Sequence, residues 1–233
     1  MLEIYMENIK PTLKYLNGKK KTIKKLSMPS LKVFFFSICV TLPAIAQKRV
    51  LIIEAYGKPA AFSGVDVSLN RSLRVSEHAT AMFKFVTKGS CIKEPCKQIN
   101  ADIIFCGYYT VKDYVHCLSV IPIIKPNIVN MSLSGLEPVE NEKKMILEAA
   151  KYSTILIAAG NNGSNYLGYP AIYSIYTDKI LAISALNEFG ERLKTSNKTK
   201  NSIDFLGIGY YSNKRMTGTS VATALYTHKL VTQ

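Results

Sequence analysis

Short apolar runs alternate with amphipathic helical patterns after residue 47, and this alternation limits the fold more than any other feature of the chain. Strands are expected at 49–54, 102–106, 127–133, 154–159 and 179–186. Helices are expected near His78, over 110–117, over 141–152 and over 220–230. Parallel strands need such helical crossovers. The sequence therefore predicts a one-domain, three-layer α/β fold with a predominantly parallel sheet flanked by helices over residues 47–233.

Polar residues follow the expected strands. Glu54, Ser132, Ser134 and Asn161 each lie at or just past a strand end. Parallel sheets bind ligands in the crevice outside the carboxyl ends of their strands. We therefore expect a functional site at that edge of the sheet.

The first 46 residues have the three-part layout of a secretory signal peptide. Five lysines between positions 19 and 25 precede the apolar run VFFFSICVTL and an A-x-A site that ends at Ala46. The stretch 31–46 is shorter than the roughly 20 apolar residues that span a bilayer. We expect cleavage before Gln47, a secreted or periplasmic product and no stable membrane span in it. Met28 would also start a leader of ordinary length, so residues 1–27 can be an upstream extension of the reading frame.

The formal net charge of +14 does not indicate nucleic-acid binding. Residues 1–46 hold eight lysines and two glutamates, so the leader supplies +6 of this charge. The remainder has neither an Arg-rich run nor a repeat of aromatic and basic residues.

Four cysteines follow the leader, at positions 91, 96, 106 and 117. An even number of cysteines in an exported chain favours disulfides, and all three connectivities of two bonds remain open. Their spacing does not form paired C-x-x-C metal knuckles. A buried free thiol is the alternative, above all for Cys106 after its apolar run.

The segment MTGTSVATA, which contains Ser220, places a serine before an apolar helical run. A serine at a helix start is ordinarily an N-cap. The same position suits a nucleophile, because backbone N–H groups at the helix N-terminus can donate to a developing oxyanion.

Five segments decide between these interpretations: VLIIEAYG, SEHATAMF, IVNMSLSG, ILIAAGNNGSNYLGYPAIY and GTSVATA, in that order. Together they resemble the signature segments of subtilisin-like serine peptidases, where the acid ends a strand and the order is acid, His, Ser. The resemblance covers roughly residues 49–230. An α/β-hydrolase would show G-x-S-x-G instead, which this chain lacks around Ser220.

The resemblance implies Ser220 as nucleophile, His78 as general base and Asn161 as oxyanion donor. Among the other histidines, His116 lies in an amphipathic helix without a supporting motif. His228 stands eight residues beyond Ser220 on the same expected helix, about 12 Å away at the helical rise. Alternatively, Asn161 and the two residues that follow it form only a turn.

The resemblance also implies a substrate groove. Its extended side would be Ser132, Leu133, Ser134 and Gly135, and a pocket wall would be Ala158, Ala159 and Gly160. No organic cofactor is implied. Calcium stabilises many relatives, but the sequence assigns no metal site here.

Several departures from the pattern leave two functions open. The matching acid is Glu54 rather than aspartate, with Asp66 as the competing acid, and Ala79 and Ala224 replace a glycine and a proline. We also expect no inhibitory pro-segment, and the chain stops 13 residues after Ser220. The first function is an exported, monomeric serine endopeptidase that cleaves proteins or peptides through an acyl-enzyme. The second is an inactive relative that binds peptides or a protein partner.

Overall fold

The computed structural model describes residues 47–90 and 98–233, which belong to one compact unit. The strands are β1 (Lys48–Ala55), β2 (Val65–Asp66), β3 (Ala101–Tyr108), β4 (Ile128–Met131), β5 (Thr154–Ala158), β6 (Ile180–Leu186), β7 (Ile203–Leu206), β8 (Ile208–Tyr211) and β9 (Lys214–Thr217). The helices are α1 (Glu77–Lys88), α2 (Val111–Ser119), α3 (Ile121–Ile124), α4 (Glu142–Ala150), the 3-10 helix η1 (Ala171–Tyr176) and α5 (Thr219–Thr232). In this described part, no helix is both long and apolar enough to cross a bilayer.

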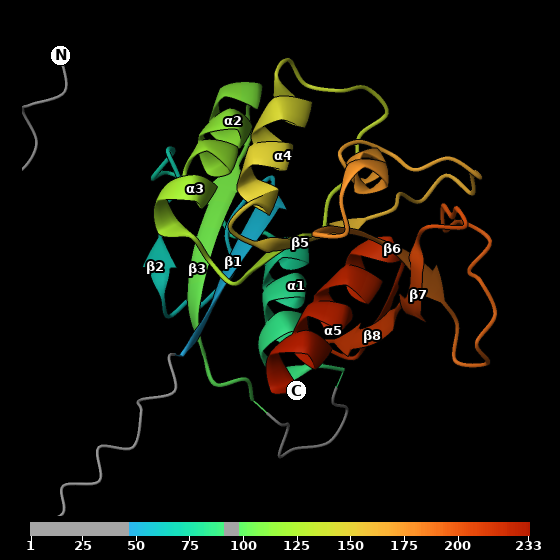
Figure 1. Cartoon of the computed structure of the whole chain (residues 1–233). Coiled ribbons are helices and arrows are strands. Elements are labelled where there is room, and N and C mark those ends of the chain that lie inside the picture. The colour runs from blue at the N-terminus through green and yellow to red at the C-terminus, as the bar shows by residue number, and fades with distance from the viewer. Residues whose placement is uncertain (1–46, 91–97) are drawn as a thin grey trace, which may run out of the picture. The chain divides into compact units, whose positions relative to one another are not determined.

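Seven strands form one parallel sheet in the order β2-β3-β1-β4-β5-β6-β7 (Figure 1). The strands β8 and β9 form a separate antiparallel hairpin. The predicted α/β class with a parallel sheet flanked by helices is therefore confirmed. The strand order reverses at β1, which pairs with β3 on one side and with β4 on the other. Such a switch point opens a crevice at the carboxyl ends of the strands.

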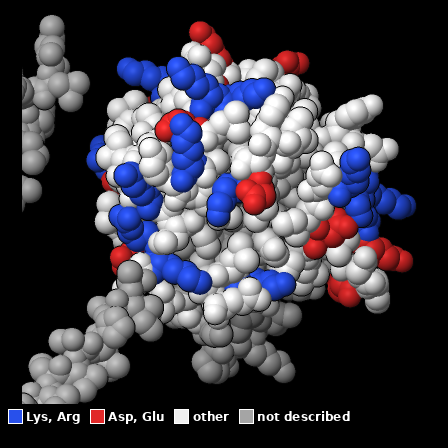
Figure 2. Space-filling view, viewed as in Figure 1, with Lys and Arg blue, Asp and Glu red and all other residues white. Residues whose placement is uncertain are grey.

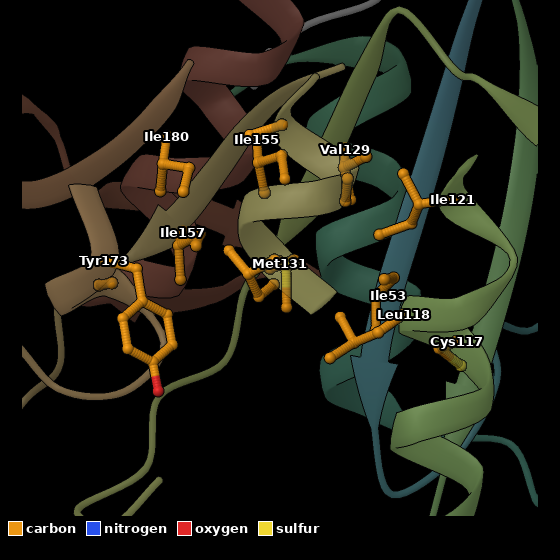
Figure 3. Packing of buried hydrophobic residues seen from close by; sticks show 14 of the residues in the cluster. Ile53, Cys117, Leu118, Ile121, Val129, Met131, Ile155, Ile157, Tyr173 and Ile180 are labelled. Atoms are coloured by element: carbon orange, nitrogen blue, oxygen red, sulfur yellow. The ribbon is translucent and has the colours of Figure 1, made fainter. Parts of the chain in front are cut away.

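The strands are continuously apolar because helices cover both faces of the sheet. In β1, Leu51 and Ile53 point into one buried cluster, whereas Val50 and Ile52 point into the other. Figure 3 shows the first cluster, in which Ile53 of β1 lies near Leu118 of α2.

Each layer of helices buries the apolar stripe that its sequence predicts. The helices α1 and α5 pack against each other and share one cluster, through residues such as Phe85 and Leu225. The helices α2 and α4 lie side by side over the other face (Figure 1). Thr110 and Asp113 form a capping box at the start of α2, and Ser76 caps α1.

The sequence pattern did not predict the short strands. The strand predicted to end at residue 133 ends at Met131, and the chain then continues without sheet pairing. The strands β2, β7, β8 and β9 have two to four residues each, too few to establish a hydrophobic period. The β8–β9 turn places Ser212 and Asn213 at positive φ, which suits the right-handed twist of a hairpin.

One disulfide joins Cys106 of β3 to Cys117 of α2. It confirms the prediction of at least one disulfide among the cysteines at 91, 96, 106 and 117, and the free-thiol alternative for Cys106 is wrong. Cys91 and Cys96 lie outside the described residues.

A buried carboxylate connects three helical segments. Glu142 of α4, 3% exposed, accepts hydrogen bonds from the hydroxyls of Tyr114 on α2 and Tyr173 on η1, at 2.8 and 3.1 Å. Burial raises the pKa of Glu142, and the two tyrosine hydrogen bonds oppose this rise.

Removing one of these hydroxyls leaves a buried carboxylate oxygen without a donor. We expect Tyr114→Phe to lower the free energy of unfolding by about 1–3 kcal/mol, the usual cost of such an unpaired group. Chemical denaturation monitored by circular dichroism would measure this loss. The matched change Tyr152→Phe, at a half-exposed ring, should leave stability unchanged. Equal stability of the two variants would contradict the structural role of Glu142.

Candidate active site

A cavity of about 630 Å³ opens at the carboxyl ends of the central strands. It lies where β1 ends, where the chain leaves β4 and β5, and where α1 and α5 begin. Most residues predicted for the site line this one cavity: His78, Ser132, Leu133, Ser134, Gly135, Gly160, Asn161 and Ser220.

Glu54 and His78 form a hydrogen-bonded pair at the cavity. Glu54 is fully buried near the end of β1, and His78 is the second residue of α1. The imidazole Nδ1 lies 3.0 Å from Glu54 Oε2. Because the carboxylate accepts, Nδ1 carries the hydrogen, and Nε2 is left as the basic nitrogen. The side chain of Glu54, which is longer than the aspartate of the subtilisin-like pattern, therefore contacts the imidazole directly.

The competing acid, Asp66, has other partners. It lies in β2, and its Oδ1 accepts the backbone N–H of Ser68 at 2.9 Å and that residue's hydroxyl. The structure thus brings Glu54 to His78 and keeps Asp66 out of the cavity lining.

Burial and the contact between Glu54 and His78 shift the pKa of each residue in opposite directions. Burial raises the pKa of Glu54, and the hydrogen bond and positive charge of His78 oppose this. Burial lowers the pKa of His78, but the hydrogen bond and negative charge of Glu54 outweigh it, so that the pKa rises above the ordinary value of 6.5. The carboxylate thus stabilises the imidazolium form of His78.

Ser220 is the second residue of α5, so its interpretation as the helix N-cap is wrong. The N-cap is Gly218, at φ 130°, a backbone conformation that suits glycine. The Ser220 hydroxyl donates to the carbonyl of Ser132 at 3.0 Å, and the Ser132 hydroxyl donates back to the carbonyl of Ser220 at 3.0 Å. The described residues show no hydrogen bond between Ser220 and His78, although both line the cavity.

Asn161 is held against the first turn of α5. Its Oδ1 accepts from the backbone N–H and the hydroxyl of Thr219, at 2.9 and 3.1 Å. Since Thr219 N–H is a donor, the amide oxygen must face it, which leaves the Nδ2 hydrogens for another acceptor. A Cβ on Gly218 would lie 3.0 Å from Asn161 Oδ1, so the glycine also allows this close approach.

The walls of the cavity come partly from the predicted segments. Ser132 to Gly135 and Gly160 line it. Ala158 and Ala159 are buried and do not line the cavity.

Sequence reasoning missed Asn197. The stretch 187–201 reads as a solvated connection, yet Asn197 is 3% exposed and lines the cavity. Its Oδ1 accepts the N–H groups of Asn162 and Ser164 at 3.1 and 3.0 Å, and its own N–H donates to Gly160 at 2.9 Å. No motif or period marks an asparagine that acts through loop-to-loop contacts.

Within 47–90 and 98–233, no group of three or more His, Cys, Asp or Glu side chains could hold a metal ion.

Comparison with known proteins gives structural matches only. No family model and no curated protein sequence matches the chain. The prenylagaramide maturation protease PagA matches with a TM-score of 0.61 and 20% identity, over 79% of this chain and 73% of that one. The protease domain of PatA matches as a serine-to-alanine mutant (TM-score 0.60, 19% identity, 78% and 76% covered) and in self-cleaved form (0.57, 19%, 78% and 77%). These likenesses establish a subtilisin-like fold.

Proposed function

We propose that this chain is a serine endopeptidase that cleaves proteins or peptides through an acyl-enzyme on Ser220. The observation that carries the proposal is the Glu54–His78 pair, at 3.0 Å, which opens onto the cavity that also contains the Ser220 hydroxyl. The subtilisin-like fold supports the same activity.

Ser220, His78 and Glu54 have different roles in the proposed reaction. The hydroxyl of Ser220 turns from the Ser132 carbonyl toward His78 Nε2, gives up its proton there and attacks the substrate carbonyl carbon. His78 then passes this proton to the leaving amine, and the peptide bond breaks. A water molecule, deprotonated in turn by His78, attacks the ester carbon and regenerates the Ser220 hydroxyl. Glu54 orients the imidazole and stabilises its charged form throughout.

Negative charge develops on the substrate oxygen when Ser220 attacks. The Nδ2 hydrogens of Asn161 and the N–H groups of the first turn of α5 can donate hydrogen bonds to this oxygen and stabilise its charge. We expect Asn161→Ala to lower kcat by about 10²–10³-fold with little change in KM, since the contact strengthens only in the transition state. Steady-state hydrolysis of a peptide substrate would measure this. The control, Asn165→Ala, changes an exposed asparagine outside the cavity lining and should retain activity; an equal loss in both variants would contradict the assignment.

A non-catalytic peptide-binding protein is the second candidate. The observation that favours it is the hydrogen bond from Ser220 to the Ser132 carbonyl, because this bond leaves the nucleophile unpaired with its base. The two candidates differ in whether an unstructured polypeptide acquires new N-termini during incubation with the full chain. The endopeptidase produces them, and its Ser220→Ala variant does not.

We propose that residues 1–46, which lie outside the described residues, direct export. The Cys106–Cys117 disulfide supports an oxidising destination such as the periplasm or the exterior. We expect the exported protein to begin at Gln47, which N-terminal sequencing of the mature product would show. An N-terminus that still carries the apolar segment 31–46 would contradict this cleavage.

We further propose that the protein acts as a monomer on peptide substrates and does not bind nucleic acid. Figure 2 shows Lys and Arg side chains at many places on one face, with Asp and Glu side chains beside some of them. Several basic side chains are paired with acids, as Lys198 is with Asp204 and Arg215 with Glu188. A basic charge that acidic side chains partly neutralise supports the absence of nucleic-acid binding.

A further inference from the structure

Asn197 binds the backbone on both sides of Asn161, the proposed oxyanion donor. The N–H of Asn197 donates to the carbonyl of Gly160, the residue before Asn161, at 2.9 Å. The side-chain Oδ1 of Asn197 accepts the N–H groups of Asn162 and Ser164, which follow Asn161, at 3.1 and 3.0 Å. Asn161 therefore cannot shift with its loop unless at least one of these three hydrogen bonds breaks.

Asn197 is itself fixed to the central sheet. Its carbonyl accepts the hydroxyls of Ser184 at 2.7 Å and of Ser196 at 3.0 Å. Ser184 lies in β6 and has no exposed surface. The amide of Asn197 also packs against Gly160, where a Cβ would lie 2.5 Å from Nδ2 and where φ is 111°. Because the sheet holds Asn197, the loop that Asn197 binds is positioned more precisely than a free loop would be.

Different residues hold the side chain and the backbone of Asn161. Thr219 donates two hydrogen bonds to Asn161 Oδ1 and so orients the amide. Asn197 contacts the backbone around Asn161, and in the described residues it makes no hydrogen bond to the side chain of Asn161 or to Ser220. The place of Asn161 Nδ2 in the cavity thus depends on both contacts. An error near 1 Å in such a place can cost about 10²-fold in rate.

We propose that Asn197 is a positioning residue of the site, which fixes the backbone around Asn161 so that the Asn161 amide meets the developing oxyanion. The proposal rests on the proposed peptidase function and deepens it. Charge develops on the substrate oxygen only in the transition state, so loss of this positioning should lower kcat and leave KM nearly unchanged. Since Asn197 acts through Asn161, the loss should not exceed that of Asn161→Ala.

A double-mutant cycle with Asn161→Ala tests the proposal in the full chain. Asn197→Ala should lower kcat for a peptide substrate by about 10²-fold at nearly constant KM. In the Asn161→Ala background, the same change should lower kcat by less than about 3-fold, because residues that act as a unit are not additive. An equal loss in both backgrounds, or a loss confined to KM, would overturn the proposal, because Asn197 would then act directly on the substrate or through the fold alone.

Asn187→Ala is the matched control. Asn187 belongs to the same polar stretch, and its Oδ1 likewise accepts two N–H groups, from Phe189 and Glu191, both at 2.9 Å. It does not line the cavity, so its replacement should leave kcat unchanged. Circular dichroism should show that each variant is folded. If Asn197→Ala does not fold, Asn197→Ser takes its place with the same expected results, because the shorter side chain cannot bond to both N–H groups.

Amide hydrogen exchange, followed by NMR, separates this proposal from the catalytic one. In Asn197→Ala, the N–H groups of Asn162 and Ser164 should exchange about 10-fold faster, because they lose their acceptor. In Asn197→Asp, which keeps an acceptor oxygen, both should stay protected. If the wild type cleaves no peptide but exchange responds in this way, the peptidase function fails and the positioning role stands. If peptides are cleaved but exchange in Asn197→Ala equals that in the wild type, the positioning role fails alone.

Discussion

Replacement of His78 by alanine is expected to lower kcat for peptide hydrolysis by about 10⁶-fold, the scale of base removal in a subtilisin triad. The reason is geometric. His78 is the one histidine that lines the cavity in the described part of the chain, and its Nδ1 is already held by Glu54 at 3.0 Å. Without it, no other side chain there can take the proton of Ser220. A progress curve with a chromogenic peptide ester or amide would measure the loss.

His116→Ala is the matched control for this variant. The His116 ring contacts the carbonyl of Val67 at 2.9 Å and does not line the cavity. The control should retain activity within about 10-fold, and circular dichroism should show that both variants are folded. Comparable activity in His78→Ala and His116→Ala would contradict the assignment of the base.

Glu54→Gln is expected to lower kcat by about 10⁴-fold, the loss found when a triad acid becomes its amide. The amide removes the charge that stabilises the imidazolium form of His78, and it can present a donor to Nδ1 in place of an acceptor. Asp66→Asn should have little effect, because Asp66 bonds to Ser68 and not to His78. Glu54→Asp withdraws the carboxylate by roughly 1.5 Å, which can cost about 10²-fold. A large loss from Asp66→Asn with little from Glu54→Gln would overturn the assignment of the acid.

The same pair predicts a pH dependence with a definite sign. His78 acts as a base only when unprotonated, and Glu54 raises its pKa above 6.5. The kcat/KM of the wild type should therefore rise with pH through a midpoint above 6.5. In Glu54→Gln, burial still lowers the pKa of His78 and the opposing charge is gone, so the midpoint should move to lower pH. An unchanged midpoint in this variant would contradict the coupling.

The order of the elements was predictable from the sequence because helices cover both faces of the sheet. Strands such as β1 and β5 are therefore apolar runs, and α1 and α2 carry the stripes and caps of helices. The position of Glu54 at the carboxyl end of β1 was predictable for the same reason. The hairpin β8–β9 was not, because its strands are too short to show a period.

The parts of the site that depend on contacts between distant loops were not predictable. Asn197 lies in a polar stretch, and only the fold brings its amide against Gly160 and Asn162. The hydrogen bond from Ser220 to the Ser132 carbonyl joins residues 88 positions apart. The position of Ser134 between Gly160 and Gly168 likewise follows from pairing between segments that share no local pattern.

Labelling of the folded full chain with a fluorophosphonate probe, followed by tandem mass spectrometry, tests whether Ser220 is an activated nucleophile, because only an activated serine reacts. We expect one adduct, on Ser220, that disappears in Ser220→Ala and falls sharply in His78→Ala. A correctly folded chain without an adduct, or with the adduct on another serine, would contradict this assignment.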